Sequence, residues 1–380
     1  MRVQDAQGNA TVLRSVDLQR SLWNAAGRIG TSAGARRDVR AVRVPPTDAR
    51  NMRVGVTGAT GFVGAALVRR LLQAGASVRA LARRSARADE LEARGVEVVR
   101  GDLRDAEAVE RAVAGAEVVY HTAAMVEGQG SRKDFIETNV GGTQCVFEGC
   151  MRKSVPRVVY LSSVAVYGLA QKGERINEDT PFDGSLEERD SYARSKIEAD
   201  QYAVAIGRKT KLAVTILRPG IVFGPGRPLP TALLGFRFDK TNVVFGRREQ
   251  RFPLTYVENL VDAMVSVGRG ANGGLRQYIV IDDDDLTLGQ YYLARAEVQK
   301  TRAIFLPGWP VLLGASLASA VGAGRRLPKR QVERSLQDRW YDTRRIREET
   351  GWAPKVPLRE AIEQTIRPAF PGRGDAARRT

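Results

Sequence analysis

A loop with three glycines lies between a predicted strand and a predicted helix, and it limits the possible folds more than any other feature. The strand is expected over residues 53–57 and the helix over 65–74. The glycines have the spacing G-x-x-G-x-x-G and are Gly58, Gly61 and Gly64. Glycine lets the backbone turn tightly and approach a ligand closely, and a helix N-terminus attracts negative charge. The segment therefore predicts a site for the diphosphate of a dinucleotide. The other residues of the loop predicted to bind it are Thr60, Phe62 and Val63.

Five more predicted strands follow, and helical patterns separate most of them. They are expected over residues 77–81, 96–100, 117–121, 157–162 and 212–217. Strands that alternate with helices through short linkers predict a parallel sheet covered on both faces. Right-handed crossovers make such an α/β fold doubly wound, and its ligand lies outside the carboxyl ends of the strands.

Composition divides the chain into four segments. Residues 1–51 are a basic leader, interpreted either as disordered or as a wrongly assigned start. Residues 52–220 are predicted to form the nucleotide-binding domain, to which a later strand near 254–280 can return. Residues 221–370 are predicted to be mainly a smaller, discontinuous substrate-binding part, and residues 371–380 are a basic tail.

The net charge of +17 suggests an anionic partner, so its distribution matters. The leader holds nine Arg against four Asp and the tail three Arg against one Asp, which leaves +10 on residues 52–370. Both ends are nearly free of the aromatic side chains on which nucleic-acid bases stack. We therefore expect a small-molecule substrate and no nucleic acid.

Residues 304–324 contain no charged side chain, but Pro307, Pro310 and several glycines interrupt them. We expect a buried helix, or a lid helix over a substrate pocket, rather than a membrane span. Peripheral contact with a bilayer is the alternative.

The end of the second predicted strand indicates which dinucleotide is preferred. A site for NAD usually holds the ribose 2′-hydroxyl with a carboxylate there. This sequence has Arg83 and Arg84, followed by Ser85, and no carboxylate. Guanidinium groups suit phosphate oxygens, so NADP is favoured over NAD. The alternative is that the two arginines are a solvated pair.

Tyr192 and Lys196, four residues apart, are the main candidates for chemistry. In a helix these positions share a face, so the ammonium group is expected beside the phenol, where it lowers the tyrosine pKa. Tyr192 can then exchange a proton with a substrate oxygen while a hydride leaves or arrives. Lys196 can also hold a ribose hydroxyl. Ser163, just past a strand end, is expected to hydrogen-bond the same substrate oxygen.

The composition excludes several other chemistries. A single histidine, His121, and two cysteines, Cys145 and Cys150, exclude a multi-histidine metal centre and a disulfide framework, and no metal is expected. His121 is interpreted as part of the cofactor-facing loop rather than as a titrating catalyst. The cysteines are interpreted as buried apolar residues in a reducing cytoplasm.

Together these motifs resemble the extended short-chain dehydrogenases/reductases, the NAD-dependent epimerase/dehydratase superfamily. Within this superfamily, the sequence segments resemble most those of the 3β-hydroxysteroid dehydrogenases and the dihydroflavonol reductases. The matching segments are VTGATGFVG at 56–64, GDL at 101–103, HTAA at 121–124, NVGGT at 139–143, LSSVAVYG at 161–168, YARSK at 192–196, LRPGIVFGP at 217–225, TYVENL at 255–260 and GWAP at 351–354.

The resemblance implies a doubly wound (Rossmann) sheet and further cofactor contacts. From the adenine to the nicotinamide these contacts are Asp102, Leu103, Ala123, Ala124, Pro219 and Gly220. Asn139 is expected to support the active site. The resemblance also implies a homodimer formed by helices near residues 139–151 and 192–205.

Differences from the family's subgroups narrow the reaction. Its sugar-nucleotide 4,6-dehydratases carry an Asp-Glu pair after the catalytic Ser or Thr, whereas an apolar Val-Ala-Val sequence follows Ser163. We expect no dehydratase, but an NADP-dependent oxidoreductase that transfers hydride at a hydroxyl or carbonyl carbon of a fairly apolar, sterol- or flavonoid-like substrate. One alternative is a sugar-nucleotide epimerase or reductase, with Arg247, Arg248 and Arg251 on the diphosphate. The other is a non-catalytic NADP-binding regulatory protein.

Overall fold

The computed structural model describes residues 2–4, 10–12, 51–126, 130–168, 174–184, 186–229, 235–270, 273–320 and 329–366. The basic tail predicted over 371–380 and most of the leader predicted over 1–51 lie outside these residues. Within the leader, β1 (Arg2–Gln4) and β2 (Ala10–Val12) form an antiparallel pair. The main body is described from residue 51 onward.

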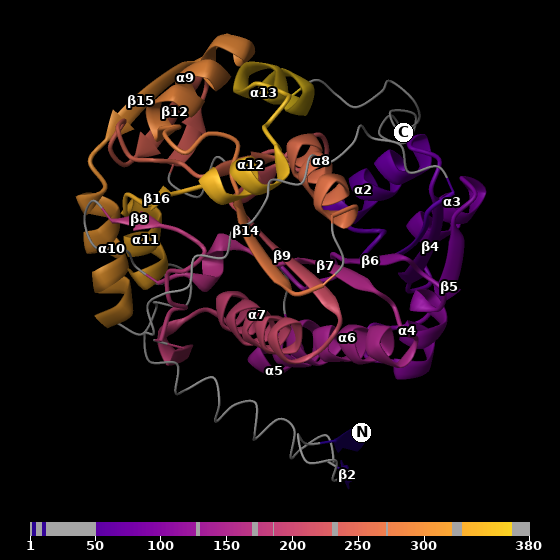
Figure 1. The fold of residues 1–380 in the computed structure, drawn as a ribbon. Coiled ribbons are helices and arrows are strands. Elements are labelled where there is room, and N and C mark those ends of the chain that lie inside the picture. Colours follow the sequence, from indigo (N-terminus) through magenta and orange to yellow (C-terminus); the bar gives the residue numbers. More distant parts are fainter. Residues whose placement is uncertain are drawn as a thin grey trace, which may run out of the picture.

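A seven-stranded parallel sheet forms the centre of the molecule (Figure 1). In spatial order its strands are β14 (Leu275–Val280), β9 (Ala213–Pro219), β7 (Arg157–Leu161), β6 (Val118–His121), β3 (Arg53–Thr57), β4 (Ser77–Ala82) and β5 (Glu97–Arg100). The strands β3, β4, β5, β6, β7 and β9 agree with the predicted ones to within two residues. The strand order reverses next to β3, which confirms the doubly wound α/β fold and puts the switch point between β3 and β6.

Helices cover both faces of this sheet, because its buried strands are apolar on both sides. Figure 1 shows α2 (Phe62–Gln73) and α8 (Val257–Gly268) on one face, and α4 (Ala106–Val113), α6 (Gly142–Arg152) and α7 (Ser191–Lys209) on the other. Leu67 and Leu260 belong to the buried cluster of the first face. Phe147 and Ala203 belong to that of the second. The sheet therefore separates two apolar layers.

The smaller part of the molecule is assembled mainly from the later chain. Its short sheets pair β10 (Ile221–Phe223) with β13 (Leu254–Tyr256), β11 (Gly235–Phe238) with β12 (Thr241–Phe245) and β15 (Arg302–Leu306), and β8 (Arg175–Ile176) with β16 (Trp340–Tyr341). Its helices are α9 (Leu288–Gln299), α10 (Trp309–Ala320), α11 (Lys329–Leu336), α12 (Arg344–Thr350) and α13 (Leu358–Ile366). The chain returns to the central sheet as α8 and β14, so this part is discontinuous in sequence.

The apolar stretch 304–324 is not the single buried or lid helix that its composition predicts. Its start belongs to β15, and α10 begins only at Trp309. Pro310 lies in the first turn, where proline is tolerated. Trp309, Leu313 and Leu317 are 65%, 52% and 61% exposed, so this side of the helix is open to solvent. Among the helices of the described residues, none is both long and apolar enough to cross a bilayer.

Candidate active site

The glycine loop joins β3 to α2, and two of its glycines leave no room for a side chain. Gly58 has a φ of +75°, and a Cβ at this residue would lie 2.6 Å from the backbone N of Ala123. A Cβ at Gly64 would lie 2.0 Å from the carbonyl oxygen of Gly58. Gly61 N donates to that same carbonyl at 2.9 Å. At Gly58 and Gly64 the backbone is therefore packed too closely to carry a side chain.

A cavity of about 1260 Å³ opens over this loop. The predicted cofactor residues that line it are Gly58, Thr60, Gly61, Phe62, Arg83, Asp102, Leu103, Ala123 and Ala124. Helix α2 has no side-chain cap at its N-terminus and no acidic residue in its first turn, so its amide groups can face an anion. The glycine cradle, the uncapped helix and the elongated cavity fit a dinucleotide.

The other predicted contacts do not line this cavity, and they are Val63, Gly64, Arg84, Tyr192, Lys196, Pro219 and Gly220. Gly64 is needed for close packing below the loop, as described above. Gly220 is held at the end of β9, where its N–H donates to Thr255 Oγ1 at 3.0 Å. A Cβ there would lie 2.3 Å from the carbonyl oxygen of Pro253. In this structure, therefore, Gly220 serves the packing of β9 against the segment before β13.

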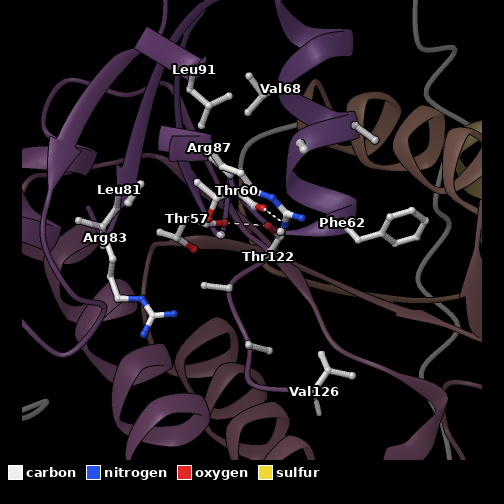
Figure 2. A pocket seen from close by; sticks show the side chains of 18 of the residues that line it. Thr57, Thr60, Phe62, Val68, Leu81, Arg83, Arg87, Leu91, Thr122 and Val126 are labelled. Atoms are coloured by element: carbon white, nitrogen blue, oxygen red, sulfur yellow. Dashed lines mark hydrogen bonds between the residues drawn. The ribbon is translucent and has the colours of Figure 1, made fainter. Parts of the chain in front are cut away.

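Two arginines from the region after β4 reach the cavity (Figure 2). Arg83 and Arg87 line it, whereas the exposed Arg84 does not. Arg87 donates to the carbonyl oxygen of Thr60 at 3.2 Å and so stands over the glycine loop. The Ser85 hydroxyl caps α3 (Ala86–Ala93) instead of facing a ligand. Sequence reasoning missed Arg87, although it belongs to the same basic segment.

Asp102 lines the cavity beyond the end of β5. Arg104 donates to Asp102 Oδ1 through Nε at 2.7 Å and through its backbone N at 3.1 Å. These bonds, with a smaller attraction from Arg83, hold the pKa of Asp102 below its usual range. Asp102 is therefore an ionised acceptor at neutral pH, and it can accept hydrogen bonds from amino or hydroxyl groups of a ligand.

Ser163 and Tyr192 meet at the carboxyl end of β7. Ser163 follows that strand, and its Oγ accepts the backbone N–H of Ala165 at 3.1 Å. Tyr192 lies in the first turn of α7, which Asp190 caps. Ser163 lies close enough to Tyr192 to lower the pKa of its phenol in part. The two hydroxyls predicted to bind one substrate oxygen are thus adjacent.

The expected effect of Lys196 on Tyr192 is not found. Lys196 Nζ donates instead to the carbonyl oxygen of Leu161 at 2.8 Å and to the hydroxyl of Tyr160 at 3.1 Å. Burial raises the pKa of Tyr192, and the neighbouring Ser163 hydroxyl offsets this only in part. The prediction of a lowered tyrosine pKa is therefore wrong for this structure, because acceptors of β7 hold the ammonium group.

A buried ion pair supports α7 behind the two hydroxyls. Arg218 of β9 donates to Asp200 through Nε at 2.9 Å and Nη2 at 2.7 Å, and Ser162 Oγ donates to the same carboxylate at 2.6 Å. Arg218 also donates to Tyr167 Oη at 2.8 Å. Burial lowers the pKa of Lys196 to about 8, and Asp200 offsets part of this. The ion pair of Arg218 and Asp200 was not predicted from the sequence. The signal that could have revealed it is the position of Asp200, four residues after Lys196.

His121 and Asn139 have structural roles, because each is hydrogen-bonded to neighbouring elements of the site. The ring nitrogens of His121 lie 2.7 and 2.9 Å from the hydroxyls of Thr57 and Thr143, and burial lowers its pKa to about 3. His121 therefore stays neutral and does not titrate near neutral pH. Asn139, in a π-helical turn, accepts from Met125 N at 2.6 Å and donates to Met125 O at 2.9 Å. Because Met125 lines the cavity, Asn139 fixes part of its wall.

The cysteines are unreactive in their surroundings. Cys150 is buried and Cys145 half-buried, and burial raises the pKa of both thiols. Within the part of the chain that the structure describes, no group of His, Cys, Asp and Glu side chains could hold a metal ion.

Comparison with known proteins gives three findings. The model of the NAD dependent epimerase/dehydratase family matches residues 54–280. A 2-alkyl-3-oxoalkanoate reductase from Shewanella oneidensis is 33% identical over 218 residues, which are 55% of this chain and 55% of that protein. This chain thus spans about half the length of that relative. A 3 beta-hydroxysteroid dehydrogenase/Delta 5→4-isomerase from Mycobacterium tuberculosis is 26% identical over 344 residues, 83% of this chain and 89% of that protein.

Among solved structures, that of gox2253 is similar with a TM-score of 0.69 and 26% sequence identity. The superposition covers 83% of this chain and 97% of that one. It therefore extends beyond the central sheet into the smaller part.

Proposed function

The chain belongs to the NAD dependent epimerase/dehydratase family, whose model matches more than half of its length, and from this premise we propose an NADP-preferring oxidoreductase. It transfers a hydride at a hydroxyl or carbonyl carbon of a fairly apolar substrate, with Tyr192 as acid and base. The observation that carries this proposal is that Ser163 and Tyr192 lie near each other at the carboxyl end of β7, in the sheet whose β3 end bears the glycine loop.

Charge supports NADP as the preferred cofactor. The glycine loop and the N-terminus of α2 offer backbone N–H groups to a diphosphate, and Arg83 and Arg87 offer guanidinium groups to a 2′-phosphate. No acidic residue follows β4 in the position that favours NAD. A bound nicotinamide supplies or accepts the hydride. NADH bound as tightly as NADPH would refute this preference.

The surroundings of Tyr192 favour reduction. Its raised pKa means that the phenol keeps its proton at neutral pH and can donate it to a carbonyl oxygen as the carbon is reduced. Ser163 holds the same oxygen and stabilises the charge that develops on it. We assign to Lys196 the positioning of a ribose hydroxyl, from its place between α7 and β7.

The relatives and the segment after Ser163 support an apolar substrate and a simple hydride transfer. The two relatives are named for a 3-oxoalkanoate and a steroid. The segment after Ser163, η2 (Val164–Val166), carries no titratable side chain where a 4,6-dehydratase needs an acid and a base. We therefore propose that elimination of water is not part of the reaction.

A sugar-nucleotide epimerase or reductase is the second candidate, with Arg247, Arg248 and Arg251 on the diphosphate. Arg251 already has partners, because its Nη1 lies 2.9 Å from Asp338 Oδ2 and its guanidinium lies 4.2 Å from the centre of the Trp340 ring. A diphosphate would have to compete with this pair. The internal pairing of Arg251 therefore favours the apolar substrate.

Substitution of Tyr192 by Phe tests the proposal. We expect turnover with NADPH to fall by roughly 10²–10⁴-fold, because the proton donor is lost, while NADPH affinity stays unchanged. Tyr202→Phe is the matched control on the same helix, since the Tyr202 hydroxyl has no hydrogen-bond partner among the described residues. Full turnover by Tyr192→Phe would exclude this tyrosine as the acid.

A substrate panel separates the alternatives. NADPH consumption is measured with steroid ketones, 3-oxoalkanoates, flavonoid-like ketones, and UDP- and dTDP-sugars. Turnover with sugar nucleotides alone would replace the leading proposal by the second candidate. If no compound gives turnover that depends on Tyr192, the non-catalytic NADP-binding protein becomes the better interpretation.

We also propose a homodimer and a cytoplasmic location. Helices α6 and α7, expected to form the dimer contact, lie side by side on one face of the sheet (Figure 1). The cytoplasmic location rests on the two unpaired cysteines. Light scattering of the purified chain measures its mass and tests the dimer.

A further inference from the structure

Exposed large apolar side chains are concentrated in three elements of the smaller part. Nine large hydrophobic side chains are exposed among the described residues, and seven of them belong to β11, β15 and α10. These seven, here called the apolar surface, are Phe236, Phe238, Ile304, Leu306, Trp309, Leu313 and Leu317. Scattered exposed apolar residues are ordinary, but such a concentration marks an interaction site.

Strand register puts the sheet residues of this surface on one face. Phe236 lies opposite Val243, which in turn lies opposite Ile304. Phe245 lies opposite Leu306, and the rings of Phe236 and Phe245 are 6.3 Å apart. The other face of these strands packs on α9. The three-stranded sheet therefore presents one open apolar face.

Helix α10 begins three positions after the last residue of β15 and carries the other exposed apolar side chains. Trp309, Leu313 and Leu317 are spaced by four residues, so they form one exposed stripe. The helix has 12 residues. Such a helix is about 18 Å long, and a bilayer core is about 30 Å thick. A short apolar helix with an exposed tryptophan is suited to lie in the headgroup region, not to span.

Basic side chains border the apolar face. Arg302 lies in the same cross-strand row as Phe238 and Thr241, and Lys240 lies at the tip of the hairpin between β11 and β12. Asp239 is the one acid in the sequence 235–245. A second copy docked through this same face would bring the Arg302 and Lys240 side chains of both copies together. Anionic lipid headgroups complement them instead.

We propose that this surface docks peripherally on an anionic lipid bilayer. Its apolar side chains enter the headgroup region, and Arg302 and Lys240 bind lipid phosphates. None of the seven residues lines the cavity over the glycine loop. The docking proposal therefore does not depend on the reaction or on the cofactor.

Sedimentation of the full chain with lipid vesicles tests the proposal. The vesicles are phosphatidylcholine alone, or phosphatidylcholine mixed with phosphatidylglycerol. We expect binding to the mixed vesicles that weakens as salt screens the charges. The triple variant Trp309→Gln/Leu313→Gln/Leu317→Gln is expected to bind more than about tenfold less, because it no longer buries apolar area. Arg302→Gln is expected to reduce binding about fivefold.

Leu293→Gln is the matched control, because Leu293 is exposed on α9, outside the apolar surface. Its vesicle binding should equal that of the unchanged chain. NADPH affinity and thermal unfolding verify that the triple variant is folded, and the single substitution Phe238→Gln repeats the test at a residue that is 73% exposed.

The proposal is wrong if the unchanged chain does not sediment with mixed vesicles, or if the triple variant and Phe238→Gln sediment as well as it does. It is also wrong if the sole effect of the triple substitution is that a dimer becomes a monomer, as measured by light scattering. That result would make the surface a contact between two copies.

Discussion

The candidate active site and the apolar surface of the smaller part differ in which side chains they bury and which they expose. Beside the candidate active site, Lys196, Asp200 and Arg218 are charged side chains that are 2%, 0% and 1% exposed. In the smaller part, Phe238 and Trp309 are apolar side chains that are mostly in solvent. Burying a charge and exposing a large apolar group are both unfavourable for an isolated domain.

The difference indicates two kinds of task. The buried charges are paired with one another and with hydroxyl or carbonyl groups, so they hold α7 against β7 and β9 and fix the position of Tyr192. The exposed apolar groups have no such partners in the described chain, so their task lies outside it. The predictions below test this contrast, from the largest expected effect to the smallest.

Loss of the buried ion pair should have the largest effect. Arg218→Met leaves the Asp200 carboxylate buried without its partner, and we expect the free energy of unfolding to fall by about 3–5 kcal/mol. Arg359→Met breaks an exposed pair with Glu363 and should cost about 0–0.5 kcal/mol. Urea denaturation measures both. Equal losses would show that burial does not distinguish the two pairs.

Removal of the cavity arginines should change cofactor selection. Arg83→Ala and Arg87→Ala each lose a charged contact worth about 1.5–3 kcal/mol, so we expect NADPH affinity to fall by about tenfold or more. NADH affinity should stay the same, since NADH lacks the 2′-phosphate. Arg84→Ala is the control, because Arg84 does not line the cavity. Calorimetric titration measures the affinities, and an equal loss in Arg84→Ala would contradict the assignment.

The pH dependence of cofactor binding tests Lys196. Burial lowers the pKa of this amine to about 8, so its positive charge is lost as the pH rises through that value. Between about pH 7 and pH 9 we expect NADPH affinity to fall several-fold, since one pKa unit corresponds to about 1.4 kcal/mol. Lys196→Met should bind NADPH weakly and without this dependence. The same slope in the variant would assign the titration to another group.

The strands of the central sheet could be predicted from the sequence because they are short apolar runs separated by helices. This pattern is local, so it can be read without knowing which strands pair. β15 was missed because its residues Arg302–Leu306 pass into an uncharged stretch that also suits a helix. The side chains of β15 alternate between exposed and partly buried because β12, some 60 residues earlier, pairs with this strand and α9 covers one face of the small sheet. Such a pairing leaves no local trace in the sequence.

The candidate site was predictable in its residues but not in their orientation. The spacing of Tyr192 and Lys196 fixes the helix face that they share, whereas the direction of the lysine side chain depends on Tyr160 and Leu161 of another strand. The same holds for Arg87, whose position follows from the cap of α3. Local spacing therefore indicated the candidate residues, and tertiary contacts set the direction in which their pKa values shift.

The smallest effect concerns the exposure of α10 itself. Outside its own helix backbone and chain neighbours, no atom of the described residues lies within 4 Å of a Cβ placed on Gly314, so Gly314→Ala should stabilise the helix by about 0.5–1 kcal/mol. A Cβ on Gly268 of α8 would lie 2.0 Å from the hydroxyl oxygen of Tyr120, and Gly268→Ala should therefore destabilise the protein. Thermal unfolding compares the two variants. A loss of stability in Gly314→Ala would mean that this side of α10 is covered in solution, and the contrast between the two parts of the molecule would then fail at this helix.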